Sequence, residues 1–167
     1  MNRNGFLMSG LALLLVVAGA GCKDNNNGNN NPVGPGGVSF PDLPSAVLSE
    51  FCYRGNALVG QTKSGTLSSS DCDAGDSYYE IWRVRVASAT SVTFDLNSVF
   101  DNWLTIVRLD GYTSSSADFS IIGENDDRSN NNLNAMLTVT LQPGIDYFVS
   151  VSGYDYSETG SYTLQIR

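Results

Sequence analysis

The chain has 167 residues, of which 41% are hydrophobic and only 16% are charged, and its 17 acidic and nine basic residues give a net charge of −8. This acidic balance repels phosphate backbones and disfavours nucleic-acid binding. There is no histidine, which removes the usual general base, the Ser-His-Asp triad and most zinc sites. The composition therefore disfavours most enzymes, and we expect a non-catalytic protein.

Residues 1–21 have the organisation of a secretory signal peptide. Arg3 supplies a positive start, the stretch from Phe6 to Val17 is nearly all apolar, and small residues follow up to Gly21. The apolar stretch is shorter than the roughly 20 residues that a membrane span needs. We therefore expect this segment to direct secretion.

The small residues lead directly into Cys22, an arrangement that resembles the bacterial lipobox, in which the cysteine is acylated and becomes the mature N-terminus. Gly19 stands where the lipobox prefers leucine, and an ordinary signal peptide cleaved near Ala20 is the alternative. The resemblance implies a lipoprotein held to the membrane by its acyl chains. Lys23, rather than an aspartate that retains many lipoproteins at the inner membrane, follows the cysteine. This predicts an outer-membrane lipoprotein of the bacterial cell envelope, facing the periplasm or the cell surface.

Residues 22–44 are predicted to form a disordered tether. The segment is rich in asparagine and glycine, and four of the five prolines lie between positions 32 and 44. Such a composition buries too little apolar surface to offset the entropy cost of ordering. A flexible chain of this length has a reach on the order of 25 Å. The folded domain is accordingly predicted to span residues 45–167.

Lipidation of Cys22 leaves Cys52 and Cys72. Two remaining cysteines in an oxidising compartment predict one disulfide. Closing a loop of this size stabilises a fold by about 3 kcal/mol in the chain-entropy model. Two free thiols or a redox pair are the alternatives, although the spacing is not that of a CxxC motif.

The predicted domain is dominated by period-two alternation of apolar and polar residues, which is typical of strands with one buried face. A single helix is expected over residues 44–51, where Leu43, Val47, Leu48 and Phe51 share one face. The clearest strands are expected at residues 81–86, 92–96, 133–141, 147–152 and 162–166. Seven or eight short strands in one domain predict an all-β fold, a single antiparallel two-sheet β-sandwich of the jelly-roll or Greek-key type.

Five short motifs in this region occur in a particular order. They are Gly65-Thr66-Leu67 with Asp71, Glu80 to Val86, Phe100 to Leu104, Asn125-Asp126-Asp127 with Asn134-Ala135, and Gly144 to Tyr147 with Gly160 to Leu164. Over residues 60–166 the chain thereby resembles the bacterial pre-peptidase C-terminal domain, a β-sandwich appended to many secreted peptidases. Two departures are the missing glycine at Ala87-Ser88-Ala89 and the Cys52–Cys72 pair. We also expect no peptidase before the domain.

The carboxylates are the only candidates for metal chemistry. Asp126 and Asp127 lie in a predicted turn with Glu124 close by in sequence, and Asp101 lies at another strand end. Three or more converging oxygens can bind Ca²⁺, the one cofactor that the sequence suggests. The alternative is that these side chains cap loops by accepting backbone N–H bonds.

Several aromatic residues fall near predicted loops or strand ends. Tyr154 and Tyr156 lie in a predicted loop, Tyr78 and Tyr79 precede a strand, and Trp103 is open to either a core or a surface role. Such rings stack on sugars or pack at strand ends. Trp82 is expected in the core.

Two functions from different classes follow from the sequence. The first is a non-catalytic, membrane-anchored, extracytoplasmic binding module that engages protein or peptide partners. The alternative is a calcium-assisted carbohydrate-binding module. In either case the partners are the membrane, through the lipid, and an unidentified envelope or extracellular protein or glycan, with no role for nucleic acid.

Overall fold

The computed structural model describes residues 37–49, 51–113, 116–129 and 131–167. The predicted signal peptide, Cys22 and most of the predicted tether lie outside these residues. No helix among the described residues is long and apolar enough to cross a membrane. The described part of the chain contains one short helix and ten strands. They are α1 (Ser45–Ser49), β1 (Tyr53–Ala57), β2 (Thr62–Leu67), β3 (Cys72–Asp73), β4 (Tyr78–Val84), β5 (Thr90–Ser98), β6 (Asn102–Tyr112), β7 (Ala117–Asn125), β8 (Met136–Leu141), β9 (Tyr147–Gly153) and β10 (Gly160–Ile166).

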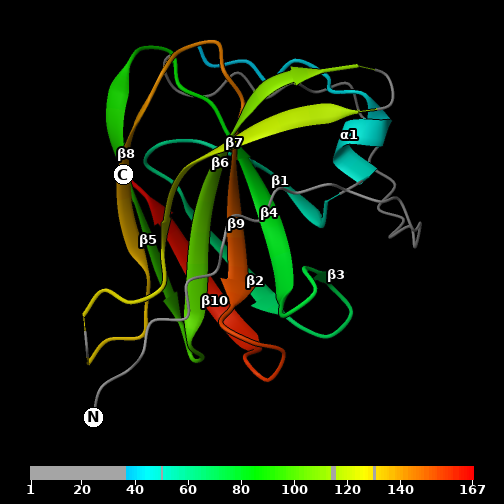
Figure 1. The fold of residues 1–167 in the computed structure, drawn as a ribbon. Coiled ribbons are helices and arrows are strands. Elements are labelled where there is room, and N and C mark those ends of the chain that lie inside the picture. The colour runs from blue at the N-terminus through cyan, green and yellow to red at the C-terminus, as the bar shows by residue number, and fades with distance from the viewer. Residues whose placement is uncertain (1–36, 50, 114–115, 130) are drawn as a thin grey trace.

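The strands form two sheets, which confirms the predicted all-β sandwich (Figure 1). The larger sheet has the order β1-β4-β9-β6-β7, with β3 paired to β4, and the smaller sheet has the order β2-β10-β5-β8. The pairing of β1 with β4 is parallel, whereas the prediction was purely antiparallel. A parallel pair needs a long crossover. Here the chain supplies it by passing through β2 of the other sheet before it returns.

The main core lies between the sheets and follows the predicted alternation. Val92, Phe94 and Leu96 of β5 are fully buried, as are Val149 and Val151 of β9. These residues belong to one continuous apolar cluster that receives side chains from both sheets. The alternation in the sequence therefore identified the inward face of these strands correctly.

The strand predicted from Leu133 begins later, at Met136, and Leu133 is 44% exposed. Before that point, side-chain hydrogen bonds add to a few main-chain ones such as that from the Leu96 N–H to the Ala135 carbonyl. Asn102 Oδ1 accepts a hydrogen bond from the Ala135 N–H at 2.8 Å, and Asn134 Oδ1 accepts one from the Ser98 N–H at 2.7 Å. The segment is thus held partly by side chains, a feature that alternation cannot show.

The outer face of the larger sheet carries a second apolar cluster. The predicted helix is confirmed as α1, and Val47 packs with Phe51, Ile81 and Phe148 in this cluster. The rings of Phe51 and Phe148 are stacked with their centroids 5.7 Å apart. Phe148 was expected on the wet face of its strand, and that expectation is wrong because the helical segment covers β9 on its outer side.

The folded domain begins before the predicted boundary at residue 45. Val38 and Phe40 are buried, and Phe40 is only 2% exposed. The Arg83 guanidinium lies 5.5 Å from the Phe40 ring and donates to the Pro41 carbonyl at 2.8 Å. Arg85 donates to the Ser39 carbonyl at 3.0 Å. Residues 37–44, assigned to the tether from their Pro and Gly content, therefore form part of the domain.

Candidate binding site

The three aspartates predicted to bind calcium take different structural roles. The main chain of Asp101 is bonded to the β9–β10 loop, because its N–H donates to Glu158 Oε2 and its carbonyl accepts from the Tyr154 N–H, both at 2.9 Å. Asp126 Oδ1 accepts from the Asp127 N–H at 2.7 Å within their own turn. Within the described ranges, no group of three or more His, Cys, Asp or Glu side chains could hold a metal ion. A calcium site here would need main-chain or amide oxygens as further ligands, and it stays a prediction.

The asparagines beside these aspartates form a buried structural network. Asn102 is fully buried, and its Nδ2 donates to Asn134 Oδ1 at 2.8 Å and to Ser98 Oγ at 2.7 Å. Together with the bonds to Ala135 and Ser98 described above, this network joins the end of β5, the start of β6 and the segment before β8. Buried amides of this kind must be bonded to be tolerated. Their role is therefore to hold three strand ends together.

A second buried polar cluster lies between β2, β4 and β10. Glu80 is fully buried, and its Oε2 accepts a hydrogen bond from the Tyr162 hydroxyl at 2.5 Å and lies 3.4 Å from Arg54 Nε. Trp82 Nε1 donates to the Tyr162 hydroxyl at 2.9 Å, and Trp82 packs against the core as expected. Gly65 lies directly under the Tyr162 ring, where a Cβ would come within 2.4 Å of ring atoms. Because Glu80 and Tyr162 are buried, the cluster supports the packing of the sheets.

Burial raises the pKa of Glu80, although the hydrogen bond from Tyr162 and the charge of Arg54 oppose this effect. A folded-state pKa above the unfolded value means that the folded protein binds the proton more tightly. The resulting contribution to stability is present below the unfolded pKa of about 4.3 and is lost as the pH rises through the folded-state pKa. The free energy of unfolding of Glu80→Gln, relative to that of the wild type, should therefore be higher at pH 8 than at pH 4.

Urea unfolding at these two pH values measures this difference. Glu124→Gln, at an exposed carboxylate of β7, is the matched control and should show no comparable change in relative stability. An equal effect of Glu80→Gln at both pH values would show that burial does not control the protonation of this carboxyl group.

Most of the singled-out aromatic residues lie near the β9–β10 loop, whereas Tyr79 packs with the apolar cluster on the outer face of the larger sheet. The Trp103 and Tyr154 rings lie 6.3 Å apart, and Tyr154 is 55% exposed. Tyr156 packs edge-on against Tyr78 at 5.2 Å, and its hydroxyl donates to Asp73 Oδ1 at 2.7 Å. That hydrogen bond raises the pKa of Tyr156 to about 12. The loop that carries Tyr154 and Tyr156 is thus fixed on both sides, by Asp73 and by Asp101.

The predicted disulfide is present between Cys52 and Cys72, whose Cα atoms are 5.4 Å apart. Cys52 directly precedes β1, and Cys72 lies in β3. Both flank β4, because the Cys52 carbonyl accepts from the Ile81 N–H at 2.8 Å and Cys72 pairs with Tyr79. A disulfide of this kind is typical of proteins outside the reducing cytoplasm.

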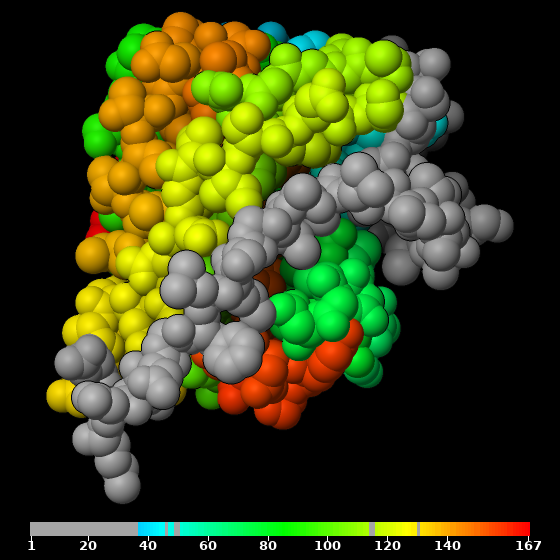
Figure 2. All heavy atoms as spheres, in the orientation of Figure 1, coloured from blue at the N-terminus to red at the C-terminus, as the bar shows by residue number. Residues whose placement is uncertain are grey.

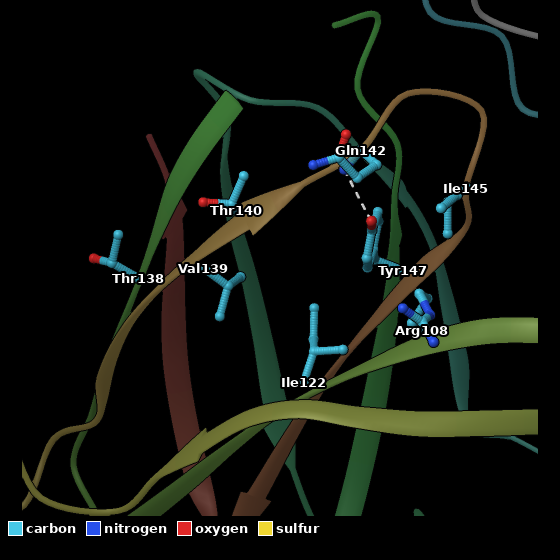
Figure 3. A pocket seen from close by; sticks show the side chains of 8 residues that line it. All are labelled: Arg108, Ile122, Thr138, Val139, Thr140, Gln142, Ile145 and Tyr147. Atoms are coloured by element: carbon cyan, nitrogen blue, oxygen red, sulfur yellow. Dashed lines mark hydrogen bonds between the residues drawn. The ribbon is translucent and has the colours of Figure 1, made fainter. Parts of the chain in front are cut away.

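A cleft that the sequence did not predict lies where the edges of the two sheets meet (Figure 3). Its volume is about 370 Å³. The lining comes from four strands and an adjoining turn that are far apart in the sequence: Arg108, Ile122, Thr138, Val139, Thr140, Gln142, Ile145 and Tyr147. Because no local motif encodes it, no sequence signal could have located it.

Two edge strands form the walls of the cleft. β7 is the last strand of the larger sheet, and β8 is the last strand of the smaller one. At Gly123 the two strands approach closely, because a Cβ there would lie 2.8 Å from Leu137 Cδ2 and 3.1 Å from Val139 Cγ1. In Figure 2 the yellow surface of β7 borders the orange surface near residue 140. The glycine closes one part of the gap between the sheets, and the cleft occupies another.

The cleft combines an apolar floor with polar sides. Ile122, Val139 and Ile145 supply the apolar surface, as the close-up shows (Figure 3). Arg108 is paired with Asp110 at 2.5 Å. Hydrogen bonds from Ser120 and then from Arg108 hold the pKa of Asp110 below its ordinary value. The charge of Arg108 is therefore largely balanced, so the cleft suits an apolar side chain better than a free anion.

No known protein family matches the chain, and no curated protein matches it either. Several solved structures match the chain at low identity. One is the pre-peptidase C-terminal domain of collagenase from Bacillus anthracis, which is 16% identical and has a TM-score of 0.47, with 68% of this chain and 93% of that one covered.

Two further structures come from bacterial proteins. PliG of Aeromonas hydrophila, a periplasmic inhibitor of g-type lysozyme, is 11% identical with a TM-score of 0.40, and the match covers 69% of this chain and 99% of that one. CorA of Methylomicrobium album BG8, a surface-associated copper-binding protein, is 10% identical with a TM-score of 0.43. The match covers 66% of this chain and 96% of that one. These likenesses are distant, and they assign no function to this chain.

Proposed function

We propose that the protein is a non-catalytic binding module, anchored to the outer membrane through lipid on Cys22, that takes a segment of a protein partner into the cleft between β7 and β8. The observation that carries the proposal is the cleft itself, with an apolar floor beside the exposed edge of a sheet. Binding sites commonly combine apolar surface with a few polar groups that fix orientation. An extended peptide meets both requirements.

The other polar clusters offer less to a ligand. Glu80, Tyr162 and Asn102 are buried and bonded to one another or to neighbouring strand ends, so they act inside the fold. Perturbed carboxyl groups can mark catalytic sites. The perturbed carboxyl of Glu80, however, is fully buried between the sheets. The cleft, unlike these clusters, is open to the solvent.

A peptide array and a glycan array, both probed with the full-length chain, test the proposal. We expect retention of peptides with apolar side chains, and loss of about tenfold or more in affinity on Ile122→Arg, which places a charge on the apolar floor. Ile121→Arg is the matched control, because Ile121 is 54% exposed and does not line the cleft. Failure to retain peptides, or equal binding by the two variants, would contradict the proposal.

The lipid anchor is tested separately. Cys22→Ser should prevent acylation, and we expect the protein to move largely from the detergent-requiring membrane fraction to the soluble one, because the acyl chains supply the membrane affinity. The measurement is fractionation of cells labelled with radioactive fatty acid. If the Cys22→Ser protein still needs detergent for extraction and carries the label, the proposal that Cys22 bears the lipid is wrong.

A second candidate function has one observation in its favour. Trp103 of β6 and the exposed Tyr154 of the β9–β10 loop present neighbouring rings, and such rings can stack on sugars. The glycan array described above tests this alternative. Specific retention of a glycan that is lost on Tyr154→Ala would favour a carbohydrate-binding module.

A further inference from the structure

The hydrogen-bonding pattern of β8 determines which of its main-chain groups are directed into the cleft. The Leu96 N–H donates to the Ala135 carbonyl at 3.0 Å, just before β8 begins. The register continues without a shift, pairing Phe94 with Leu137 and Thr93 with Thr138. In an antiparallel ladder, hydrogen-bonded and non-hydrogen-bonded pairs alternate. The odd-numbered residues of β8 therefore bond to β5, and the even-numbered ones turn their N–H and C=O groups toward the free edge.

Two side chains confirm this direction and close the ends of the free edge. The Met136 carbonyl accepts a hydrogen bond from Asn125 Nδ2 at 3.0 Å. Beyond the other end of the strand, the Gln142 N–H donates to the Tyr147 hydroxyl at 2.9 Å, as Figure 3 shows. Between these two contacts, no main-chain partner is found among the described residues for the outward groups of Thr138 and Thr140.

The open stretch also lacks the features that usually protect an edge strand. The sequence of β8, from Met136 to Leu141, has no charge, proline or glycine, and its pairing has no bulge. Native edges are normally blocked by such features. β7, by comparison, carries Asp118 and Glu124 and has two register shifts against β6. The exposed groups of Thr138 and Thr140 both belong to residues that line the cleft.

We propose that the cleft binds an extended peptide segment by strand addition, with the main chain of the peptide paired to Thr138 and Thr140. This deepens the proposed function and rests on it. Main-chain hydrogen bonds supply affinity in this mode of recognition, and pockets for alternate side chains supply specificity. Every second side chain of the peptide faces the floor formed by Ile122, Val139 and Ile145. The ligand class is therefore a segment with apolar residues at alternate positions.

The occupant is a single short strand rather than the sheet edge of a second copy. About five residues, or about 17 Å of extended chain, fit between the bonds made by Asn125 and Tyr147. β7, the edge of the larger sheet, approaches the side chains of β8 at Gly123 and so obstructs the approach of another sheet to this edge. The net charge of −8 also disfavours close contact between two copies.

The probe is the best-binding hexapeptide that the full-length chain selects from a random library. Thr140→Pro removes the outward N–H and leaves the ladder to β5 intact, and we expect it to weaken binding about tenfold or more. Thr66→Pro is the matched control. Thr66 is an exposed threonine on β2, the opposite edge of the same sheet, and the alternation in β10 directs its N–H away from the sheet as well.

Two measurements report on the geometry of pairing. N-methylation along the hexapeptide should weaken binding at alternate positions, because only every second N–H faces β8. Hydrogen exchange should show slower exchange of the Thr138 and Thr140 amides on peptide addition, with Ser64 and Thr66 unchanged. A purely side-chain mode of binding predicts neither pattern.

The outcomes separate the inference from the proposed function. Selected peptides that bind Thr140→Pro as well as the wild type, with no alternation on N-methylation, would overturn strand addition and leave peptide binding in place. If the library yields no peptide that distinguishes Ile122→Arg from the wild type, the proposed function fails and the inference fails with it. A dimer that forms without peptide and is lost in Thr140→Pro would make a second copy the occupant.

Discussion

Replacing Asp146 by alanine is expected to lower the free energy of unfolding by about 3–5 kcal/mol, the usual cost of removing one partner from a buried ion pair. Asp146 Oδ1 accepts from Arg83 Nε at 2.6 Å, and Arg85 Nε lies 3.5 Å from the same oxygen. Arg83 is only 3% exposed, so its charge would stay buried without a counter-ion. Urea unfolding measures the loss.

The same substitution should release the N-terminal segment of the domain. Arg83 and Arg85 hold the carbonyls of Pro41 and Ser39, and Arg83 also covers the Phe40 ring. Without Asp146 the guanidinium groups lose the carboxylate that orients them. We therefore expect faster proteolysis near residue 40 in Asp146→Ala than in the wild type, even under conditions where the sandwich remains folded.

Two controls distinguish the buried charge from a simple loss of contacts. Asp118→Ala, at an exposed position of β7, should change stability by less than about 0.5 kcal/mol. The double variant Arg83→Met/Asp146→Leu should lose less than Asp146→Ala, because no uncompensated charge remains. A loss below about 1 kcal/mol for Asp146→Ala would contradict a buried, stabilised pair.

Cys52→Ala is expected to lower the free energy of unfolding by about 2–5 kcal/mol, as removal of a native disulfide does in small secreted domains. The bridge closes a loop with a sequence separation of 20. That loop contains β1 and β2, which belong to different sheets. Breaking the bridge gives the unfolded chain more freedom and frees the connection that makes β1 parallel to β4.

The control uses the Cys22→Ser background, in which Cys52 and Cys72 are the remaining cysteines. Thiol titration of the denatured, unreduced protein should find no free thiol. The double variant Cys52→Ala/Cys72→Ala should match the single variant in stability, which excludes an effect of the unpaired Cys72. Two titratable thiols in the unreduced protein would show that Cys52 and Cys72 do not form a disulfide.

The sequence by itself determined the class of fold and much of its inner face. Alternation in β5 and β10 follows directly from the pleat, because successive side chains point to opposite faces of a strand. Val92, Phe94 and Leu164 are accordingly buried as expected. The disulfide followed from an even number of cysteines after lipidation, and the helix followed from four apolar residues on one face. These are local signals, and each is encoded within a few residues or by composition.

Only the tertiary structure decided what lies against the outer faces and at the edges. Ile81 and Phe148 sit on strand faces that alternation assigns to water, and they are buried because α1 and Phe51 cover them. Phe40 lies in a segment rich in proline and glycine, and it is buried against Leu58 and the Arg83 guanidinium, both distant in the sequence.

The candidate site depends on distant residues to a still greater degree. Its cleft combines Arg108, Ile122, Thr140 and Tyr147 from four strands, and the direction of the β8 main chain depends on its register against β5. A period-two pattern specifies which side chains share a face. It predicts neither which strand lies next to it nor whether the strand lies at the edge of a sheet. The physical reason is that edges and clefts are properties of strand order, which long-range packing sets.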